Sequence, residues 1–401
     1  MKLKKFIFIK VLLLSASLVF AAATVNEPGL IDVRSLGMGG MHITDTADFY
    51  TLLKNPAGLG LTGSKLMISV VSANVGGPLQ ELPGVYDQYM QGEEITDIVS
   101  DLMQKDVKLN LGVGLDGPLC FGDISENGFG WGFFESVKVD ANVPSITLAE
   151  VTAQLEVGFV MGYGFALNFG AGTALSVGAT AEAYALVPRL AIRDSLTNIM
   201  DMVSGDGNNN NNQYDNIPLD SVAGLSCDIG AQFRLFNFLD IAAVWEDAYS
   251  PYKTTTTTVG EAMEDYSVLF ADYGETQFQT GKFRAGVGLN LLPNGILGGL
   301  ISSLKVQADV KDVALFWKQF IQKEVSPLDK SPWLNVTAGA ELGLMHFIYG
   351  RVGYSDGFAT VGASIKLGAL NFDAAIYTNE FGRTPGTNSQ MNAAVSVGLF
   401  L

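Results

Sequence analysis

The chain has 401 residues, of which 48% are apolar and 46 are glycine, and its formal net charge is −17 at pH 7. Beyond the extreme N-terminus no run of 18 or more apolar residues occurs, which argues against a membrane protein built of helices. The acidic balance leaves no basic stripe that would neutralise phosphates, so we expect no nucleic-acid partner.

The first 23 residues have the pattern of a secretory signal peptide. Four lysines lie within residues 1–10, an apolar stretch follows over 11–20, and residues 21–23 are alanines. This order is typical of a signal that is cleaved, here after Ala21 or Ala23, and the alternative is an uncleaved anchor helix. Cleavage would remove the four lysines and leave a mature chain with a net charge of −21.

Residues that carry chemistry are scarce. The two cysteines, Cys120 and Cys227, can pair in an oxidising compartment, although nothing in the sequence demands it. With two cysteines and two histidines we expect no metal site and no cofactor. Neither His42 nor His346 has an obvious serine partner, and the glycine-rich run over 158–164 lies inside a strand pattern. We therefore expect that the protein is not an enzyme.

Residues 34–60, RSLGMGGMHITDTADFYTLLKNPAGLG, differ from the rest of the chain. A glycine cluster, which permits close backbone approach, precedes a short helical pattern. We expect Asp45 to be the N-cap of this helix and Asp48 to occupy its third position, because acids are favoured at helix starts. The helix should end before Pro56, since the residue before a proline is disfavoured in the α region.

From residue 65 onward the dominant period is two. In residues 391–401, for example, the odd positions are all apolar, and several segments of this kind reach the ten residues that a tilted strand needs to cross a bilayer. A soluble sandwich is the alternative, but the signal peptide favours an all-β, about 14-stranded antiparallel transmembrane barrel. The candidate strands are 65–74, 107–119, 128–142, 149–165, 167–184, 221–235, 238–247, 281–291, 302–313, 333–345, 347–355, 357–367, 369–378 and 391–401.

The connections agree with this number of strands. Long connections follow odd-numbered strands and short ones follow even-numbered strands, as in a barrel with both termini on the periplasmic side. Most of the mature charge lies in three loop segments, with nineteen acids against three basic residues in 75–106, 193–220 and 246–275. We divide the chain into a signal peptide at 1–23, an N-terminal hatch or plug at 24–64, and a barrel at 65–401 with long external loops at 75–106, 185–220, 248–280 and 314–332.

Three of these loops contain apolar residues at helical spacing, around residues 95–103, 192–200 and 313–321. The predicted helices either pack on one another to cap the barrel or form an apolar groove that collects a ligand at the external mouth, and both can hold together. The candidate ligand-binding residues are Ile98, Leu102, Met103, Leu196, Ile199, Phe316, Trp317 and Phe320.

A barrel of about fourteen strands is too wide for its own side chains to fill, so its lumen holds water or a plug. The segment before the strands is the spare piece of chain, and it resembles the hatch of the FadL/TodX family of outer-membrane transporters for long-chain fatty acids and other hydrophobic compounds. The family pattern reads R-x-x-G-x-G-G/S, then an alanine- and acid-rich stretch, then N-P-A-G-L/M. Its matches here are Arg34, Gly37, Gly39, Gly40, Asp48, Asn55, Pro56, Ala57, Gly58 and Leu59.

The chain departs from the family in two places. Ala47 stands where the usual pair of aspartates has its first acid, and the chain ends Leu-Phe-Leu where a barrel insertion signal usually ends on an aromatic residue. A glycine-rich strand such as 158–172 is the candidate for the kinked strand of lateral release.

The resemblance implies an outer-membrane protein of a diderm bacterium that captures an apolar ligand at its external loops, passes it by the hatch and releases it laterally into the bilayer. The implied partners are a long-chain fatty acid or other hydrophobic ligand, outer-membrane lipid and the barrel-assembly machinery. The alternatives are a scaffold or shuttle barrel of a secretion system, which binds proteins, and a general porin.

Overall fold

A computed structural model of the chain describes residues 31–40, 42–46, 50–62, 65–77, 107–117, 119–124, 127–145, 148–195, 198–199, 215–271, 273–293, 295–324 and 329–400. The predicted signal peptide at 1–23 and most of the predicted loop at 75–106 lie outside these residues. Among the residues that the structure describes, no helix is long and apolar enough to span a membrane.

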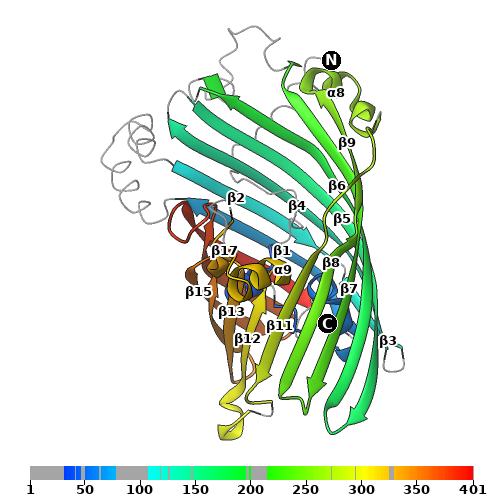
Figure 1. The fold of residues 1–401 in the computed structure, drawn as a ribbon, viewed down its shortest axis with the longest axis vertical. Helices are drawn as coiled ribbons and strands as arrows, with labels where there is room; N and C mark the ends of the chain where they lie inside the picture. The colour runs from blue at the N-terminus through cyan, green and yellow to red at the C-terminus, as the bar shows by residue number, and fades with distance from the viewer. Residues whose placement is uncertain are drawn as a thin grey trace.

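Most of the described chain is β-strand (Figure 1). The strand segments are β1 (Lys65–Gly77), β2 (Val107–Asp116), β3 (Leu119–Ile124), β4 (Asn127–Ser145), β5 (Leu148–Gly170), β6 (Thr173–Asp194), β7 (Pro218–Leu235), β8 (Leu239–Tyr249), β9 (Pro251–Thr258), β10 (Gln277–Phe278), β11 (Lys282–Asn290), β12 (Ile301–Val310), β13 (Val336–Leu344), β14 (Ile348–Ser355), β15 (Phe358–Leu367), β16 (Leu370–Glu380) and β17 (Ser389–Phe400).

The helices are short. Three precede the barrel, namely α2 (Val33–Leu36), α3 (Thr51–Lys54) and η1 (Pro56–Leu61). The others lie in connections between strands: α8 (Val259–Glu264), η2 (Tyr266–Phe270), η3 (Leu297–Gly299), α9 (Val313–Phe316), η4 (Trp317–Ile321) and η5 (Pro332–Leu334).

The sheet closes on itself, because β1 pairs antiparallel with both β17 and β2. Three pairs of segments each act as one barrel strand: β2 and β3 both pair with β1 and β4, β8 and β9 both pair with β7, and β10 and β11 run along β9 and β8. The barrel therefore has fourteen antiparallel strands, and the N-terminal segment plugs it, so the predicted fold class is confirmed.

The predicted boundary between the fourth and fifth strands, near residue 166, was wrong. The strand alternation continues to Gly170, and the turn is made by Ala171 and Gly172, which both have positive φ angles of 50° and 70°. Two consecutive residues in this conformation give the twist that a tight hairpin needs. The run 158–164 lies inside β5, as expected. Cys227 has a free thiol in the structure.

The barrel is taller on one side than on the other. Strands β4–β7, here called the tall wall, have 18 to 23 residues, whereas β11–β17 have 8 to 12. In Figure 1 the tall wall rises well beyond the ends of the shorter strands. We call this upper end, where the connections are long, the loop end, and the opposite end the turn end. The strands of the tall wall are therefore about twice as long as the ten residues or so that a tilted strand needs to cross a bilayer.

Strand glycines make room for the backbone of the plugging segment. A Cβ added to Gly339 or Gly353 would lie 2.2 Å from backbone atoms of Met38, and one added to Gly178 would lie 2.4 Å from the carbonyl oxygen of Pro56. These contacts are closer than any side chain allows. Glycines that weaken a strand in isolation therefore form the seat of the plug.

Gly39→Ala should unseat the plug. Gly39 has a φ of +87°, and an added Cβ would lie 2.5 Å from the carbonyl oxygen of Tyr354, so neither the conformation nor the space suits alanine. In planar bilayers we expect this variant to carry open-channel current that the wild-type chain lacks. Gly350→Ala is the matched control, because nothing lies within 4 Å of a Cβ there. Equal currents for the two variants would contradict the close seating of the plug.

Candidate functional site

The described residues between 31 and 62, here called the hatch, form α2, α3 and η1 inside the barrel. Side chains cap two of these short helices. Asp32 accepts a hydrogen bond of 3.1 Å from the backbone N–H of Ser35, and Asn55 accepts one of 3.0 Å from that of Ala57. Helices of four to six residues are not stable alone, so such caps and the surrounding barrel hold them in place.

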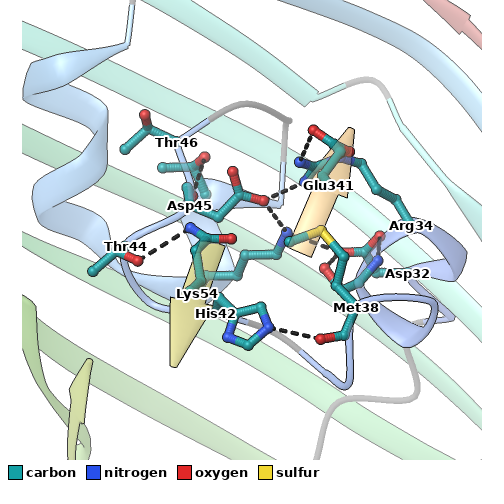
Figure 2. A network of polar contacts seen from close by, with 12 residues as sticks. Asp32, Arg34, Met38, His42, Thr44, Asp45, Thr46, Lys54 and Glu341 are labelled. Atoms are coloured by element: carbon teal, nitrogen blue, oxygen red, sulfur yellow. Dashed lines mark hydrogen bonds and ion pairs between the residues drawn. The ribbon is translucent and has the colours of Figure 1, made fainter. Parts of the chain in front are cut away.

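A buried ion-pair network joins the hatch to the barrel (Figure 2). Arg34 of α2 donates from Nε and Nη2 to the two carboxylate oxygens of Glu341 on β13, at 3.0 and 3.1 Å, and its Nη1 contacts Asp45. Arg351 of β14 donates from Nε to the same Glu341 at 2.7 Å. One carboxylate of the wall thus links an arginine of the hatch to an arginine of the barrel, in the fork geometry that favours arginine.

Lys54 of α3 is the most deeply buried cation in this network, with no exposed side-chain surface. Its Nζ lies 2.9 Å from Oδ2 of Asp32 and 3.7 Å from Oδ2 of Asp45. Removing an ammonium group from water costs several kcal/mol unless carboxylates neutralise it. Burial alone would raise the pKa of Asp45, but the charges of Arg34, Lys54 and Lys305 outweigh that effect and hold the pKa well below its ordinary value of 3.8.

The prediction that Asp45 is a helix N-cap is wrong. Helix α3 begins at Thr51, and its N-cap is Tyr50, which makes no side-chain capping bond. Asp45 lies beside Arg34 and Lys54 instead, because two buried cations attract a carboxylate more strongly than the end of a four-residue helix does. Asp48 lies outside the described residues.

A second contact of the hatch with the wall is made by His42. Its Nδ1 contacts a carboxylate oxygen of Asp309 on β12, and its Nε2 lies 2.8 Å from the carbonyl oxygen of Met38. Asp309 also accepts a hydrogen bond of 3.1 Å from the backbone N–H of Ile43. Both ring nitrogens therefore have oxygen partners, one on the wall and one in the hatch. His42 thus has a structural place in the hatch.

Neutral hydrogen bonds extend the contact around the barrel. Ser176 of β6 donates to the carbonyl oxygen of Ala57 at 2.6 Å, and Thr360 of β15 donates to that of Gly37 at 3.2 Å. These strands lie on different sides of the closed sheet. The hatch is therefore held from several directions and fills the barrel at this level.

The second barrel strand is interrupted beside the hatch. β2 ends at Asp116 and β3 begins at Leu119, and the N–H of Gly117 between them bonds to the carbonyl oxygen of Phe133 on β4 at 2.9 Å. A Cβ at Gly117 would lie 2.5 Å from the carbonyl oxygen of Ile68, so the neighbouring strand closes against the break. From the hatch, Tyr50 donates its hydroxyl to Oδ2 of Asp116 at 2.7 Å.

An apolar cluster lies next to this break. Leu52 and Leu59 of the hatch pack with Met67 and Val70 of β1 and Val160 of β5, and all five are buried. In register, Met67 is the partner of the first residue of β3. The apolar side of the hatch therefore faces the part of the wall where the strand is broken.

Aromatic side chains gather in the connection between β12 and β13 at the loop end. The ring of Phe316 stacks on that of Phe320 at 4.5 Å, and the edge of Trp333 meets Phe320 at 6.0 Å. Trp317 and Trp333 each expose more than half of their surface. The predicted helix over 313–321 is confirmed as α9 and η4, and Figure 1 shows it above the ends of the shorter strands.

The candidate ligand-binding residues do not form one group. Phe316, Trp317 and Phe320 belong to the aromatic group just described, whereas Ile199 is buried against Val139 and Val151 of the tall wall. The helix predicted around 192–200 is confirmed only in its second half. Residues up to 194 belong to strand β6, whereas residues 198 and 199 are helical and the N–H of Ile199 donates to the carbonyl oxygen of Ser195 at 3.1 Å. The other four candidates, Ile98, Leu102, Met103 and Leu196, lie outside the described residues.

The inner face of the tall wall is polar above the hatch. On β4 to β7, the residues at even positions face the hatch, because glycines at these positions contact it. By the same alternation, five charged side chains also point inward, namely those of Lys138, Asp140, Glu156, Glu182 and Asp228. Such a surface offers little contact to an apolar molecule. Apolar contact is provided by the aromatic group at the loop end and by the cluster around Leu52. Two other buried apolar clusters lie on the tall wall, one around Val151 with Ile199 and one around Leu190 with α8.

Sequence reasoning placed the hatch motif but missed its partners. Asp32, Lys54, Glu341, Arg351 and Asp309 carry the charge network, and none of them was singled out. A signal did exist for the strand residues, because Glu341 and Asp309 occupy the polar positions of otherwise apolar alternating segments. Charges on the inward face of a barrel strand, opposite a plug that itself carries an arginine and a lysine, indicate ion pairs between them.

Comparisons with known proteins returned structures only. No family model and no curated protein matches the chain. Among solved structures, the toluene transporter TodX of P. putida matches with 11% identity and a TM-score of 0.47 over 91% of this chain and 97% of that chain. The toluene transporter TbuX of Ralstonia pickettii matches with 12% identity and a TM-score of 0.44 over 94% and 99%. A FadL homologue of Pseudomonas aeruginosa matches with 10% identity and a TM-score of 0.44 over 95% and 99%. At these values the similarities assign neither a family nor a function to the chain.

Asp45→Asn should loosen the hatch at neutral pH. The substitution removes the carboxylate charge that pairs with Arg34 and Lys54, so these two buried cations are no longer fully neutralised. Breaking a buried ion pair in this way lowers the free energy of unfolding by about 3 kcal/mol. We expect trypsin to cleave at Lys54 at a lower urea concentration than in the wild-type chain. The control is Asp356→Asn. The carboxylate of Asp356 lies 2.7 Å from Nζ of Lys311, and both side chains are partly exposed, so loss of this ion pair costs about 1 kcal/mol or less. Equal effects of the two changes would contradict a buried role for Asp45.

Acid should have the same effect on the unaltered chain. The pKa of Asp45 is lowered on folding, so its contribution to stability is complete above the ordinary value of 3.8 and is lost as the pH falls through the lower value of the folded chain. We expect the urea midpoint for hatch cleavage to fall as the pH is lowered below about 4 in the wild type, and to fall less in Asp45→Asn. A pepsin assay, which works in acid, provides the measurement. Parallel pH profiles would show that Asp45 is not the responsible group.

Proposed function

We propose that this protein is an outer-membrane transporter that takes up small hydrophobic molecules, long-chain fatty acids among them, through a plugged barrel. The observation that carries the proposal is the hatch itself, which is held by buried ion pairs at Glu341 and Asp309 and by an apolar cluster beside a broken strand. A general porin needs an open aqueous lumen, so a tightly seated plug favours a transporter.

The aromatic group of Phe316, Phe320 and Trp333 is the proposed place of capture. Exposed aromatic rings at the rim of a barrel provide apolar area to a ligand that leaves water, worth about 0.8 kcal/mol for each CH2 that is buried. The polar inner face of the tall wall makes the opposite side a poor route. The ligand therefore enters on the side of the shorter strands.

The break between β2 and β3 is the proposed place of exit. There the hatch presents Leu52 and Leu59 to the wall, and β1 adds Met67 and Val70. An apolar ligand that displaces this cluster reaches the bilayer after β1 separates from its neighbour at Gly117, because no residue pair joins the two strands between Met67 and Val70. Lateral release of this kind would spare the ligand from crossing water on the far side.

The proposal includes the location and processing of the chain. The signal peptide at 1–23 would direct export, the barrel-assembly machinery would insert residues 65–401, and outer-membrane lipid would surround the barrel. Residues 24–64 would then form the hatch on the periplasmic side. The loops at 75–106, 185–220, 248–280 and 314–332 would face the exterior, which places the turn end at the periplasm.

Titration of the refolded full chain with a fluorescent long-chain fatty acid tests the function. We expect saturable binding that Phe320→Ala weakens about tenfold, because an aromatic contact contributes about 1 kcal/mol beyond its buried area. Trp245→Ala is the control, since this exposed ring stacks on Phe283 of a neighbouring barrel strand instead.

The possible outcomes separate the alternatives. Unchanged binding in Phe320→Ala would contradict capture at the aromatic group. Absence of saturable binding for both a fatty acid and toluene would contradict the transporter and leave the secretion scaffold, which binds proteins, as the better hypothesis. Large open-channel currents in the intact protein would indicate a porin.

A further inference from the structure

A buried hydrogen bond joins the hatch to the wall at the broken strand. Tyr50, directly before α3, donates its hydroxyl to Oδ2 of Asp116, the last residue of β2, at 2.7 Å. The two residues are 7% and 1% exposed. Breaking such a bond leaves buried polar groups without a partner, which is costly. The end of β2 is therefore tied to the hatch.

Asp116 stands at the edge of the break in the wall. It pairs with Val70 of β1, and the next pair below joins Met67 to Leu119 of β3. Gly117 lies between these pairs, and its N–H donates to β4, on the side away from β1. Directly below Asp116, β1 and its neighbour thus have no residue pair that holds them together.

The same tyrosine contacts the buried charges of the hatch. Nζ of Lys54, one turn further along the chain, lies 5.9 Å from the centroid of the Tyr50 ring, a distance at which an ammonium group is attracted to an aromatic face. Lys54 is in turn paired with Asp32 at 2.9 Å. The Tyr50 ring therefore lies beside the charge network, and its hydroxyl lies at the edge of the broken strand.

The hatch bridges the break. On one side, Leu52 belongs to the same buried cluster as Met67 and Val70 of β1. On the other side, Tyr50 holds the end of β2 through Asp116. Leu52 and Tyr50 are two residues apart at the start of a four-residue helix, so α3 moves both of them together. A ligand that displaces Leu52 from β1 consequently also withdraws Tyr50 from β2.

We propose that Tyr50 is a positioning residue of the exit, which acts through Asp116 to keep the wall closed until a ligand enters. The inference rests on the proposed function, since the exit lies at this break. A ligand that enters the apolar cluster separates α3 from the wall, and the hydroxyl of Tyr50 leaves Asp116. β1 then parts from its neighbour at Gly117. Tyr50 thus couples movement of the hatch to opening of the wall.

Hydrogen exchange of the detergent-solubilised full chain, read by mass spectrometry, tests the coupling without a ligand. Tyr50→Phe removes only the hydroxyl. We expect the amides of residues 113–119 to exchange about tenfold faster than in the wild type, because loss of a buried hydrogen bond favours local opening. Tyr377→Phe is the matched control. Tyr377 is also 7% exposed and packs against the hatch, but its hydroxyl makes only a long contact of 3.5 Å with Asn74, so exchange at 113–119 should stay unchanged.

A double-substitution cycle assigns the effect to this one bond. Asp116→Ala should also speed exchange at 113–119, and Tyr50→Phe should add nothing to it, because the bond is already lost. Far-ultraviolet circular dichroism confirms that each variant is folded. Unchanged exchange in Tyr50→Phe, an equal rise in Tyr377→Phe, or additive effects of the two substitutions would overturn the proposal.

A ligand should have the same effect as the substitution. Saturating long-chain fatty acid should speed exchange at 113–119 in the wild type and change it little in Tyr50→Phe. In proteoliposomes, Tyr50→Phe should transfer bound fatty acid to the lipid faster than the wild type, whereas a tyrosine that only stabilised the fold would slow transfer when altered. Fatty acid that binds without changing this exchange would overturn the coupling. Failure of the proposed function appears instead as absence of saturable binding, and the exchange of ligand-free Tyr50→Phe then still decides whether Tyr50 holds the strand.

Discussion

Lys54 and Arg34 are cations buried inside a wide barrel, and much of the structure around the hatch serves to neutralise them. Burial of either cation costs free energy unless carboxylates neutralise its charge. Three carboxylates, those of Asp32, Asp45 and Glu341, therefore come together around the two cations. Two of these acids come from the hatch and one from strand β13. The hatch is consequently not a loose filler, because its charges are balanced only when it is docked against the wall.

The wall is shaped to receive the hatch as much as the hatch is shaped to fill the wall. Where the hatch backbone approaches the wall, the strands carry glycine, namely Gly178, Gly339 and Gly353. On the hatch side, Gly39 lies against the backbone carbonyl oxygens of Ala338 and Tyr354. Polar strand residues then reach carbonyl oxygens that no helix satisfies. Glycine weakens a strand in isolation, but at these positions the loss is offset by close contact with the backbone of the hatch.

The seat is not uniform around the barrel. On the side of β13–β15 it consists of ion pairs and glycine contacts, and beside β1 and the break between β2 and β3 it is apolar. Near Gly288 it opens into a polar pocket. These three environments differ in chemistry, since Leu52 and Leu59 provide apolar contact whereas Thr44, Asp45 and Lys305 line a polar space.

The sequence by itself determined the fourteen strands, their antiparallel order, and the need for a plug drawn from the N-terminal segment. These properties are local, because side chains alternate with a period of two and the lengths of connections alternate with the strand number. Helix α9 with η4 was predictable for the same reason. The hatch motif at Arg34 and Asn55 was visible as a pattern, although its meaning came from a resemblance.

Only the tertiary structure decided which residues act together. Arg34 and Glu341 are 307 residues apart, and no period or spacing links them. For that reason Asp45 was mistaken for a helix cap, and Ile199 was grouped with aromatic residues from which the fold separates it. The register of four strands likewise decided the pocket, since Gly288 creates a gap only because Asp240, Gln307 and Thr44 surround it. Long-range pairing in a closed sheet turns separate polar residues into sites, and that pairing is not written in any single segment.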